Sequence, residues 1–125
     1  DCYNANPASM VDALQAFQSS APSGLPRCYI IGAMNELGEM AEPFHVSVGE
    51  RLELRPEDKV VFVGPHALTE AYRRGAASGG IAPGQIQSVE NCGSIESMVA
   101  DFKGALFLKG SRSHQLEKLL PESVL

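Results

Sequence analysis

Arg27-Cys28-Tyr29-Ile30-Ile31 decides the fold class of this chain, and it ends at Gly32. It is an apolar run between turn signals, since the breaker cluster at 21–26 precedes it. Runs of this kind are typical of strands that are covered on both faces, as in parallel sheets. The run therefore predicts a buried strand.

Three further segments have the character of strands: 59–63, which closes with Gly64-Pro65, the weaker 85–89, and 105–108. Helical patterns fill the intervals and predict helices over roughly 7–19, 40–54, 66–76, 94–102 and 112–120. The residues predicted to face inward are, in chain order, Met10, Ala13, Leu14, Phe17, Met40, Phe44, Val48, Leu52, Ala67, Leu68, Ala71, Tyr72, Ile95, Met98, Val99, Phe102, Leu116, Leu119 and Leu120. The glycine-rich segment 75–84 is predicted to be a loop.

Strands and helices alternate through short connections, which predicts right-handed crossovers and a sheet with helices on both faces. The fold class is therefore α/β: a Rossmann-like three-layer α/β/α domain with a mainly parallel sheet. All 125 residues are expected to form one domain. Ligands in such sheets gather beyond the carboxyl ends of the strands.

Composition excludes several classes of function. The formal net charge is −5, with acids and bases interspersed, which argues against a nucleic-acid surface, since such a surface needs a basic face. No apolar run approaches the length of about 20 residues that crosses a bilayer, and no signal peptide is visible. The three cysteines, Cys2, Cys28 and Cys92, are an odd number without metal-type spacing. We expect reduced thiols in a cytoplasmic protein, with Cys28 in the core.

A polar cluster, Asp1-Cys2-Tyr3-Asn4-Ala5-Asn6-Pro7, stands directly before the first predicted helix. Asn6 is a good N-cap, and Pro7 suits the first helical position, where its missing N–H is no loss. The free backbone N–H groups of a helix start favour an anionic or hydroxyl-rich ligand. The alternative is that these residues simply form a turn.

The order of these residues resembles the opening motif of the C-terminal domain of the Mur ligases. Two further segments resemble motifs of that family in the same order: Gly32-Ala33-Met34-Asn35-Glu36-Leu37-Gly38 with His45 downstream, and Leu108-Lys109-Gly110-Ser111-Arg112. The resemblance covers nearly the whole chain and is greatest to the members that add D-Ala-D-Ala. Ala33 departs from the pattern, which usually has Asp there, so any role of that carboxylate is lost or moved to Asn35 or Glu36.

The resemblance implies an ATP-dependent ligase of peptidoglycan synthesis that joins D-Ala-D-Ala to UDP-MurNAc-tripeptide. It also implies that a strand, a central ATP-binding domain and an N-terminal UDP-sugar domain lie upstream. Residues 1–125 would then be an excised C-terminal domain, inactive alone and partnered by its own upstream domains. The phosphate-binding lysine and the Mg²⁺ ligands would belong to the central domain, so no catalytic residue is expected here.

The resemblance also implies binding residues. Asp1 would accept hydrogen bonds from the ribose hydroxyls of ATP, Tyr3 or Asn4 would contact the base, and Asn6 would be a further ATP-binding residue. Lys109, Ser111 and Arg112 would hold the carboxylate of D-Ala-D-Ala, because a hydroxyl, a helix start and a guanidinium together suit a carboxylate. The alternative for Ser111 is a plain helix cap, with a solvated Arg112. Asn35 and Glu36 complete the predicted substrate contacts.

The histidines and the phosphate-binding motifs lead to further expectations. His45 is expected to make a structural hydrogen bond rather than a substrate contact. His66 and His114 lack metal-ligand spacing. The chain also has no phosphate loop, so it should not bind ATP tightly by itself.

Two alternative functions remain. One is a C-terminal domain of a folylpolyglutamate or cyanophycin synthetase, which more often carry Asp-x-Ala-His-Asn-Pro. The other is a free-standing α/β nucleotide-binding domain. A phospho-receiver is disfavoured, because the second predicted strand ends in Gly64-Pro65 without an acceptor Asp.

Overall fold

The structure is a computed structural model that describes residues 6–110. Its helices and strands, in chain order, are α1 (Pro7–Ser20), β1 (Arg27–Gly32), α2 (Ala41–Glu50), β2 (Lys59–Val63), α3 (His66–Ser78), β3 (Ile86–Val89), α4 (Glu96–Asp101) and β4 (Ala105–Lys109). Short 3₁₀ turns precede α2, β3 and α4: η1 (Gly38–Met40), η2 (Pro83–Gln85) and η3 (Cys92–Ile95). The helix predicted at 112–120 lies outside the described residues.

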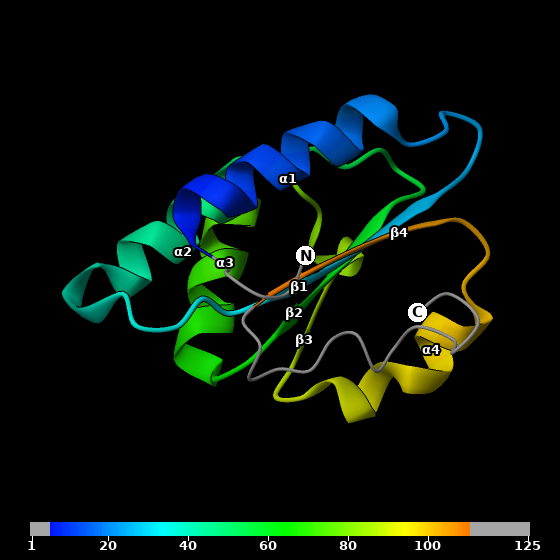
Figure 1. The fold of residues 1–125 in the computed structure, drawn as a ribbon. Coiled ribbons are helices and arrows are strands. Elements are labelled where there is room, and N and C mark those ends of the chain that lie inside the picture. The colour runs from blue at the N-terminus through cyan, green and yellow to red at the C-terminus, as the bar shows by residue number, and fades with distance from the viewer. Residues whose placement is uncertain (1–5, 111–125) are drawn as a thin grey trace.

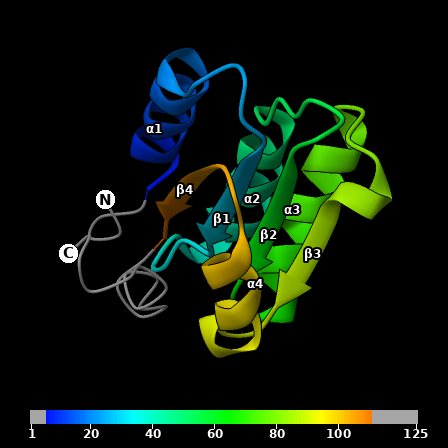
Figure 2. The ribbon, with the colours of Figure 1, turned by 90° about the vertical axis from the view of Figure 1, so that its right-hand side faces the viewer.

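The four strands form one parallel sheet in the order β3-β2-β1-β4. Helices α1, α2 and α3 cover one face, and α4 covers the other (Figures 1 and 2). The predicted three-layer α/β fold with a parallel sheet is confirmed. No helix in the part of the chain that the structure describes is both long and apolar enough to cross a membrane.

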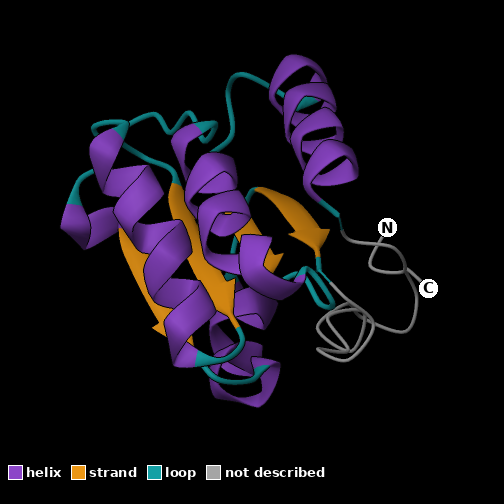
Figure 3. Ribbon diagram, turned by 90° about the vertical axis from the view of Figure 1, so that its left-hand side faces the viewer, coloured by secondary structure: helices purple, strands orange, loops and turns teal. Residues whose placement is uncertain are grey.

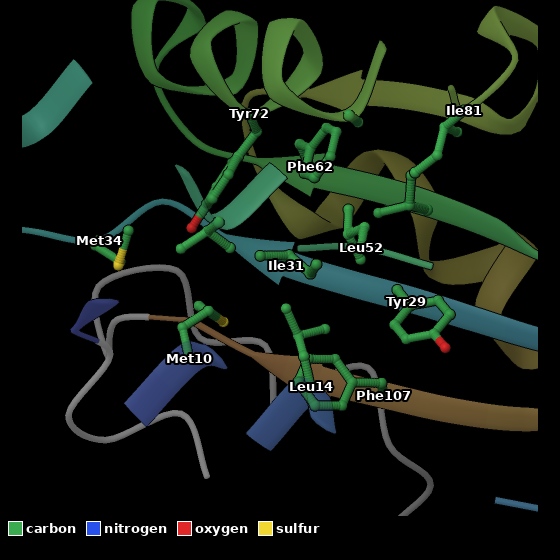
Figure 4. Close-up of a cluster of buried hydrophobic side chains, with 13 residues drawn as sticks. Met10, Leu14, Tyr29, Ile31, Met34, Leu52, Phe62, Tyr72, Ile81 and Phe107 are labelled. Carbon is green, nitrogen blue, oxygen red and sulfur yellow. The ribbon is translucent and has the colours of Figure 1, made fainter. Parts of the chain in front are cut away.

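The central strand β1 explains why its sequence is apolar throughout. Alternate residues of a strand point to opposite faces. Tyr29 and Ile31 therefore enter the cluster beneath α1, α2 and α3 (Figure 4), while Cys28 and Ile30 enter the cluster beneath α4. All four side chains are fully buried. The predicted core position of Cys28 is confirmed, and burial raises the pKa of its thiol to about 11.

The second predicted helix is shorter than expected. Helix α2 begins at Ala41, close to the expected start, but it ends at Glu50, so the prediction that it continues to about residue 54 is wrong. Pro43 fits only the first turn of a helix, which puts the helix start at Ala41 and leaves Met40 in η1, 48% exposed rather than in the core. Leu52 is buried as predicted, but from the turn after the helix.

The glycine-rich segment is also different from the prediction. Residues 75–78 are the last turn of α3, not a loop. A Cβ at Gly75 would collide with the main-chain oxygen of Val46 in α2, and a Cβ at Gly49 would collide with that of Tyr72 in α3. The glycines therefore let α2 and α3 cross in backbone contact. Ala67, predicted to face inward, is exposed in the first turn of α3, where Thr69 is buried instead.

The amino end of the sheet is closed by a polar group of residues that we call the Asp58 network. The Asp58 carboxylate accepts the backbone N–H groups of Arg27 and Arg55, each at 2.9 Å, and two hydrogen bonds at 3.0 Å from the Arg55 guanidinium. Burial alone would raise the pKa of Asp58, but these hydrogen bonds hold it below its usual value. The Arg55 guanidinium also donates to the carbonyls of Ser23 and Leu25.

Candidate functional site at the carboxyl end of the sheet

Three segments meet at the carboxyl end of the sheet. Ile31 of β1 pairs with Lys109 of β4 in parallel register, so the loop after β1 leaves the sheet beside Lys109. Helix α1 begins at this same end (Figure 3), and its Met10 lies in one core cluster with Met34 of that loop (Figure 4). The described parts of all three family-like segments are thus brought together, as the topology rule predicts.

The start of α1 is capped as the sequence predicts. The Oδ1 atom of Asn6 accepts the backbone N–H of Ser9 at 2.9 Å, and the Ser9 hydroxyl accepts the N–H of Asn6 at 3.2 Å. With Pro7 at the first helical position, this is a complete capping box. The side-chain oxygen of Asn6 therefore has a structural role, and its predicted ATP contact stays a prediction.

The remaining predicted ATP contacts, Asp1, Tyr3 and Asn4, lie outside the described residues. So do Ser111 and Arg112 of the predicted carboxylate clamp. Their assignments also stay predictions.

The loop after β1 is held by its backbone at three successive residues. The carbonyl of Gly32 accepts a hydrogen bond of 2.8 Å from the Tyr72 hydroxyl. The N–H of Ala33 donates to the carbonyl of Val63 at 2.8 Å. The N–H of Met34 donates to Nε2 of His45 at 2.9 Å. These bonds come from α3, β2 and α2, so the loop has one fixed path over the end of the sheet.

His45 makes the structural hydrogen bond that the sequence predicts. Its side chain is fully buried, and Nδ1 lies 2.6 Å from the carbonyl of Ala41. A carbonyl only accepts, so Nδ1 carries a proton, and Nε2 must be unprotonated to accept from Met34. The geometry requires the neutral imidazole with its proton on Nδ1, and the ring packs 4.6 Å from that of Tyr72, centroid to centroid.

The next two residues, Asn35 and Glu36, are exposed. Glu36 adopts φ 59°, a left-handed conformation that costs free energy for a residue with a Cβ. Gly38 has φ 58°, where glycine carries no such cost. Ala33, which replaces the usual Asp, is fully buried. The polar surface of the loop therefore begins at Asn35, and a strained residue stands at its tip, as functional loops often show.

Lys109 ends β4 and is only 4% exposed. By strand alternation it shares the sheet face of Phe107, which is the face that α1 covers. It therefore forms part of the wall at the carboxyl end rather than a freely solvated side chain. Its predicted contact with the substrate carboxylate stays a prediction.

Metal ligands and thiols are further candidate groups in the described part of the chain. Residues 6–110 contain no group of three His, Cys, Asp or Glu side chains that could hold a metal ion. Cys28 and Cys92 are both buried, and the pKa of the Cys28 thiol is raised by burial, which makes Cys28 a poor nucleophile.

The sequence predicts Tyr72 only as a core residue, and its hydrogen bond to the carbonyl of Gly32 was not predicted. The available signal was a tyrosine rather than a phenylalanine at an inward position, since a buried phenol usually has a hydrogen-bond partner.

Comparison with known proteins gives a consistent result. Residues 1–111 match the family model described as "Mur ligase, glutamate ligase domain". Two curated relatives bear the name UDP-N-acetylmuramoyl-tripeptide–D-alanyl-D-alanine ligase. The chain is 33% identical over 124 residues to the one from Treponema pallidum (strain Nichols), which covers 97% of this chain and 26% of that protein. It is 30% identical over 123 residues to the one from Escherichia coli (strain K12), with 96% and 25% coverage.

Solved structures agree with the fold. MurF from Acinetobacter baumannii superposes with a TM-score of 0.73 at 24% identity, covering 95% of this chain and 26% of that one, which shows the shared fold. MurF ligase from Thermotoga maritima, solved in complex with ADP, gives a TM-score of 0.68 at 25% identity, with 95% and 26% coverage. The chain thus spans about a quarter of the length of the relatives it matches.

Proposed function

This chain belongs to the family of Mur ligase glutamate ligase domains, and from that premise we propose that it is the C-terminal domain of an ATP-dependent peptide ligase. The intact enzyme would join D-Ala-D-Ala to UDP-MurNAc-tripeptide in the synthesis of the peptidoglycan precursor. The names of the two curated relatives support this substrate pair, and the ADP complex of the Thermotoga relative supports ATP as the energy source.

In the proposed reaction, ATP transfers its terminal phosphoryl group to the carboxylate of the tripeptide and leaves as ADP. The amine of D-Ala-D-Ala then attacks the acyl carbon and loses a proton. The tetrahedral intermediate collapses and expels inorganic phosphate. The phosphate-binding lysine and the Mg²⁺ ligands would belong to an upstream central domain.

The observation that carries the proposal is the meeting of three segments at the carboxyl end of the sheet. The capped start of α1, the fixed loop after β1 and the end of β4 are the described parts of the three family-like motifs. In this proposal that end closes over ATP held by the central domain, and it orients the incoming amine. Orientation of two reactants and exclusion of water are the contributions that a closing domain makes to such a reaction.

A pair of substitutions in the intact ligase tests the assignment of ligands to residues. We expect Asp1→Ala to raise the KM for ATP and to leave the KM for D-Ala-D-Ala unchanged, because it removes an acceptor for the ribose hydroxyls. We expect Arg112→Ala to do the reverse. Steady-state phosphate release measures both constants, and exchanged phenotypes would contradict the proposed roles.

The acceptor itself separates the proposal from related ligases. The wild-type enzyme should release phosphate with D-Ala-D-Ala and not with L-glutamate. Turnover with L-glutamate but not with D-Ala-D-Ala as the amino substrate would instead assign the chain to a folylpolyglutamate-type synthetase.

A further inference from the structure

We infer that Tyr72 and His45 are positioning residues, which hold the loop after β1 so that Asn35 and Glu36 face the incoming amino substrate. The inference rests on the proposed function, and it assigns a role to two side chains that no ligand can touch. Both side chains are fully buried. Any effect they have on substrate binding must therefore pass through the backbone of the loop.

The two side chains hold the loop on either side of Ala33. The Tyr72 hydroxyl binds the carbonyl of Gly32 at 2.8 Å, and Nε2 of His45 binds the N–H of Met34 at 2.9 Å. Val63 accepts the N–H of Ala33 between them. Three successive residues held from three different elements cannot pivot together, so the direction in which the chain continues to Asn35 is fixed.

The base beneath these two side chains is rigid as well. The Tyr72 ring stacks on Phe62 of β2, with centroids 4.9 Å apart and planes inclined by 19°. Gly49 and Gly75 bring the backbones of α2 and α3 into contact, so the helix that carries His45 packs directly against the helix that carries Tyr72. The two hydrogen bonds to the loop thus share one support.

The conformation of Glu36, at the tip of the loop, indicates that this support has a function. Glu36 stands at φ 59°, and such a conformation persists in a residue with a Cβ only when its surroundings over-determine it. A loop without function could relax to an ordinary conformation. Here the strained residue is exposed directly after the three fixed residues, which is the arrangement expected of a preorganised contact.

A purely structural role for Tyr72 is the competing explanation, and Tyr29 provides the matched control. Tyr29 is an equally buried tyrosine of the same core cluster. Figure 4 shows it at the opposite end of the cluster from Met34, while Tyr72 lies on the side of Met34. Tyr29→Phe and Tyr72→Phe each remove one buried hydroxyl, but only Tyr72→Phe removes a hydrogen bond to the backbone at the start of the loop.

The experiment compares Tyr72→Phe and Tyr29→Phe in the intact ligase, with KM for ATP, KM for the amino substrate, kcat and melting temperature all measured. We expect Tyr72→Phe to raise the KM for the amino substrate roughly five-fold, the equivalent of one neutral hydrogen bond. The KM for ATP should not change, and Tyr29→Phe should alter neither constant. Equal KM values for the amino substrate in the two variants would overturn the inference, whatever their melting temperatures.

A second pair of variants tests His45. His45→Gln keeps an acceptor within reach of the Met34 N–H, whereas His45→Leu does not. We expect the amino-substrate KM to rise in His45→Leu and to be restored largely in His45→Gln. An equal KM in both variants would remove His45 from the inference and leave Tyr72 to be judged alone.

If the wild-type enzyme uses a different amine, the proposed function fails, and the same comparisons made with that amine still decide the positioning role. A wild-type enzyme inactive with every amine would overturn both.

Discussion

The two ends of the sheet use polar residues in opposite ways. At the amino end, the Asp58 carboxylate receives four hydrogen bonds, and the Gln85 side chain donates to the carbonyls of Arg55 and Asp58. At the carboxyl end, the side chains of Tyr72 and His45 hold the backbone of the loop after β1, and Asn35 and Glu36 are exposed. The difference teaches that one end of this sheet serves stability, while the other is the end where we propose that a ligand binds.

The largest test of this contrast is Asp58→Ala. It leaves the backbone N–H groups of Arg27 and Arg55 without their acceptor, so we expect the free energy of unfolding to fall by about 3 kcal/mol. Urea denaturation measures the loss. Asp12→Ala, at an exposed position of α1, is the control and should change stability by less than about 0.5 kcal/mol. Similar losses in both variants would mean that the Asp58 network is not a centre of stability.

A smaller effect of opposite sign is expected from Glu36→Gly at the other end. Glycine relieves the left-handed strain of about 1 kcal/mol but adds entropy to the unfolded chain, so we expect a net gain of about 0.5 kcal/mol. The KM for the amino substrate should rise at the same time. Glu39→Gly, nearby in η1 and without a positive φ, should only destabilise. Loss of stability in Glu36→Gly would show that this conformation is not strained.

The smallest expected effect is the loss of stability when the Asp58 carboxylate is protonated at low pH. The folded pKa of Asp58 lies below its unfolded value of 3.8, so the unfolded state takes up its proton first as the pH falls. The stabilisation by this carboxylate is therefore complete above about pH 4. It is lost as the pH drops through the folded pKa. The stability difference between wild type and Asp58→Asn, followed by urea denaturation, should shrink below pH 4. A constant difference would contradict the pKa shift.

Much of the fold could be predicted because its determinants are local in sequence. The apolar runs of β1 and β2, the Asn6 cap and the inward positions of α4 depend on neighbouring residues only. Because the loops that follow parallel strands lie at the same edge of the sheet, the loop after β1 is expected at the edge where β4 ends. The hydrogen bond of His45 followed from its position beside a core-facing residue.

What could not be predicted depends on residues that are distant in sequence. The Asp58 network joins residues about 30 positions apart, and in the sequence it shows only as a turn. Glycine is common both in loops and where helices pack closely, so the sequence alone does not show which of these roles Gly75 has. The contact of α2 with α3 shows that Gly75 permits a close helix crossing. The Tyr72 hydroxyl reaches a carbonyl 40 residues away, which no local pattern reports.

The outer strand β3 has a consequence for how copies of this protein behave in solution. It is four residues long, and its middle residues, Gln87 and Ser88, are exposed. A short, polar outer strand is a poor template for pairing with a strand of another molecule. At high concentration this flank should therefore resist aggregation, although its main chain faces outward.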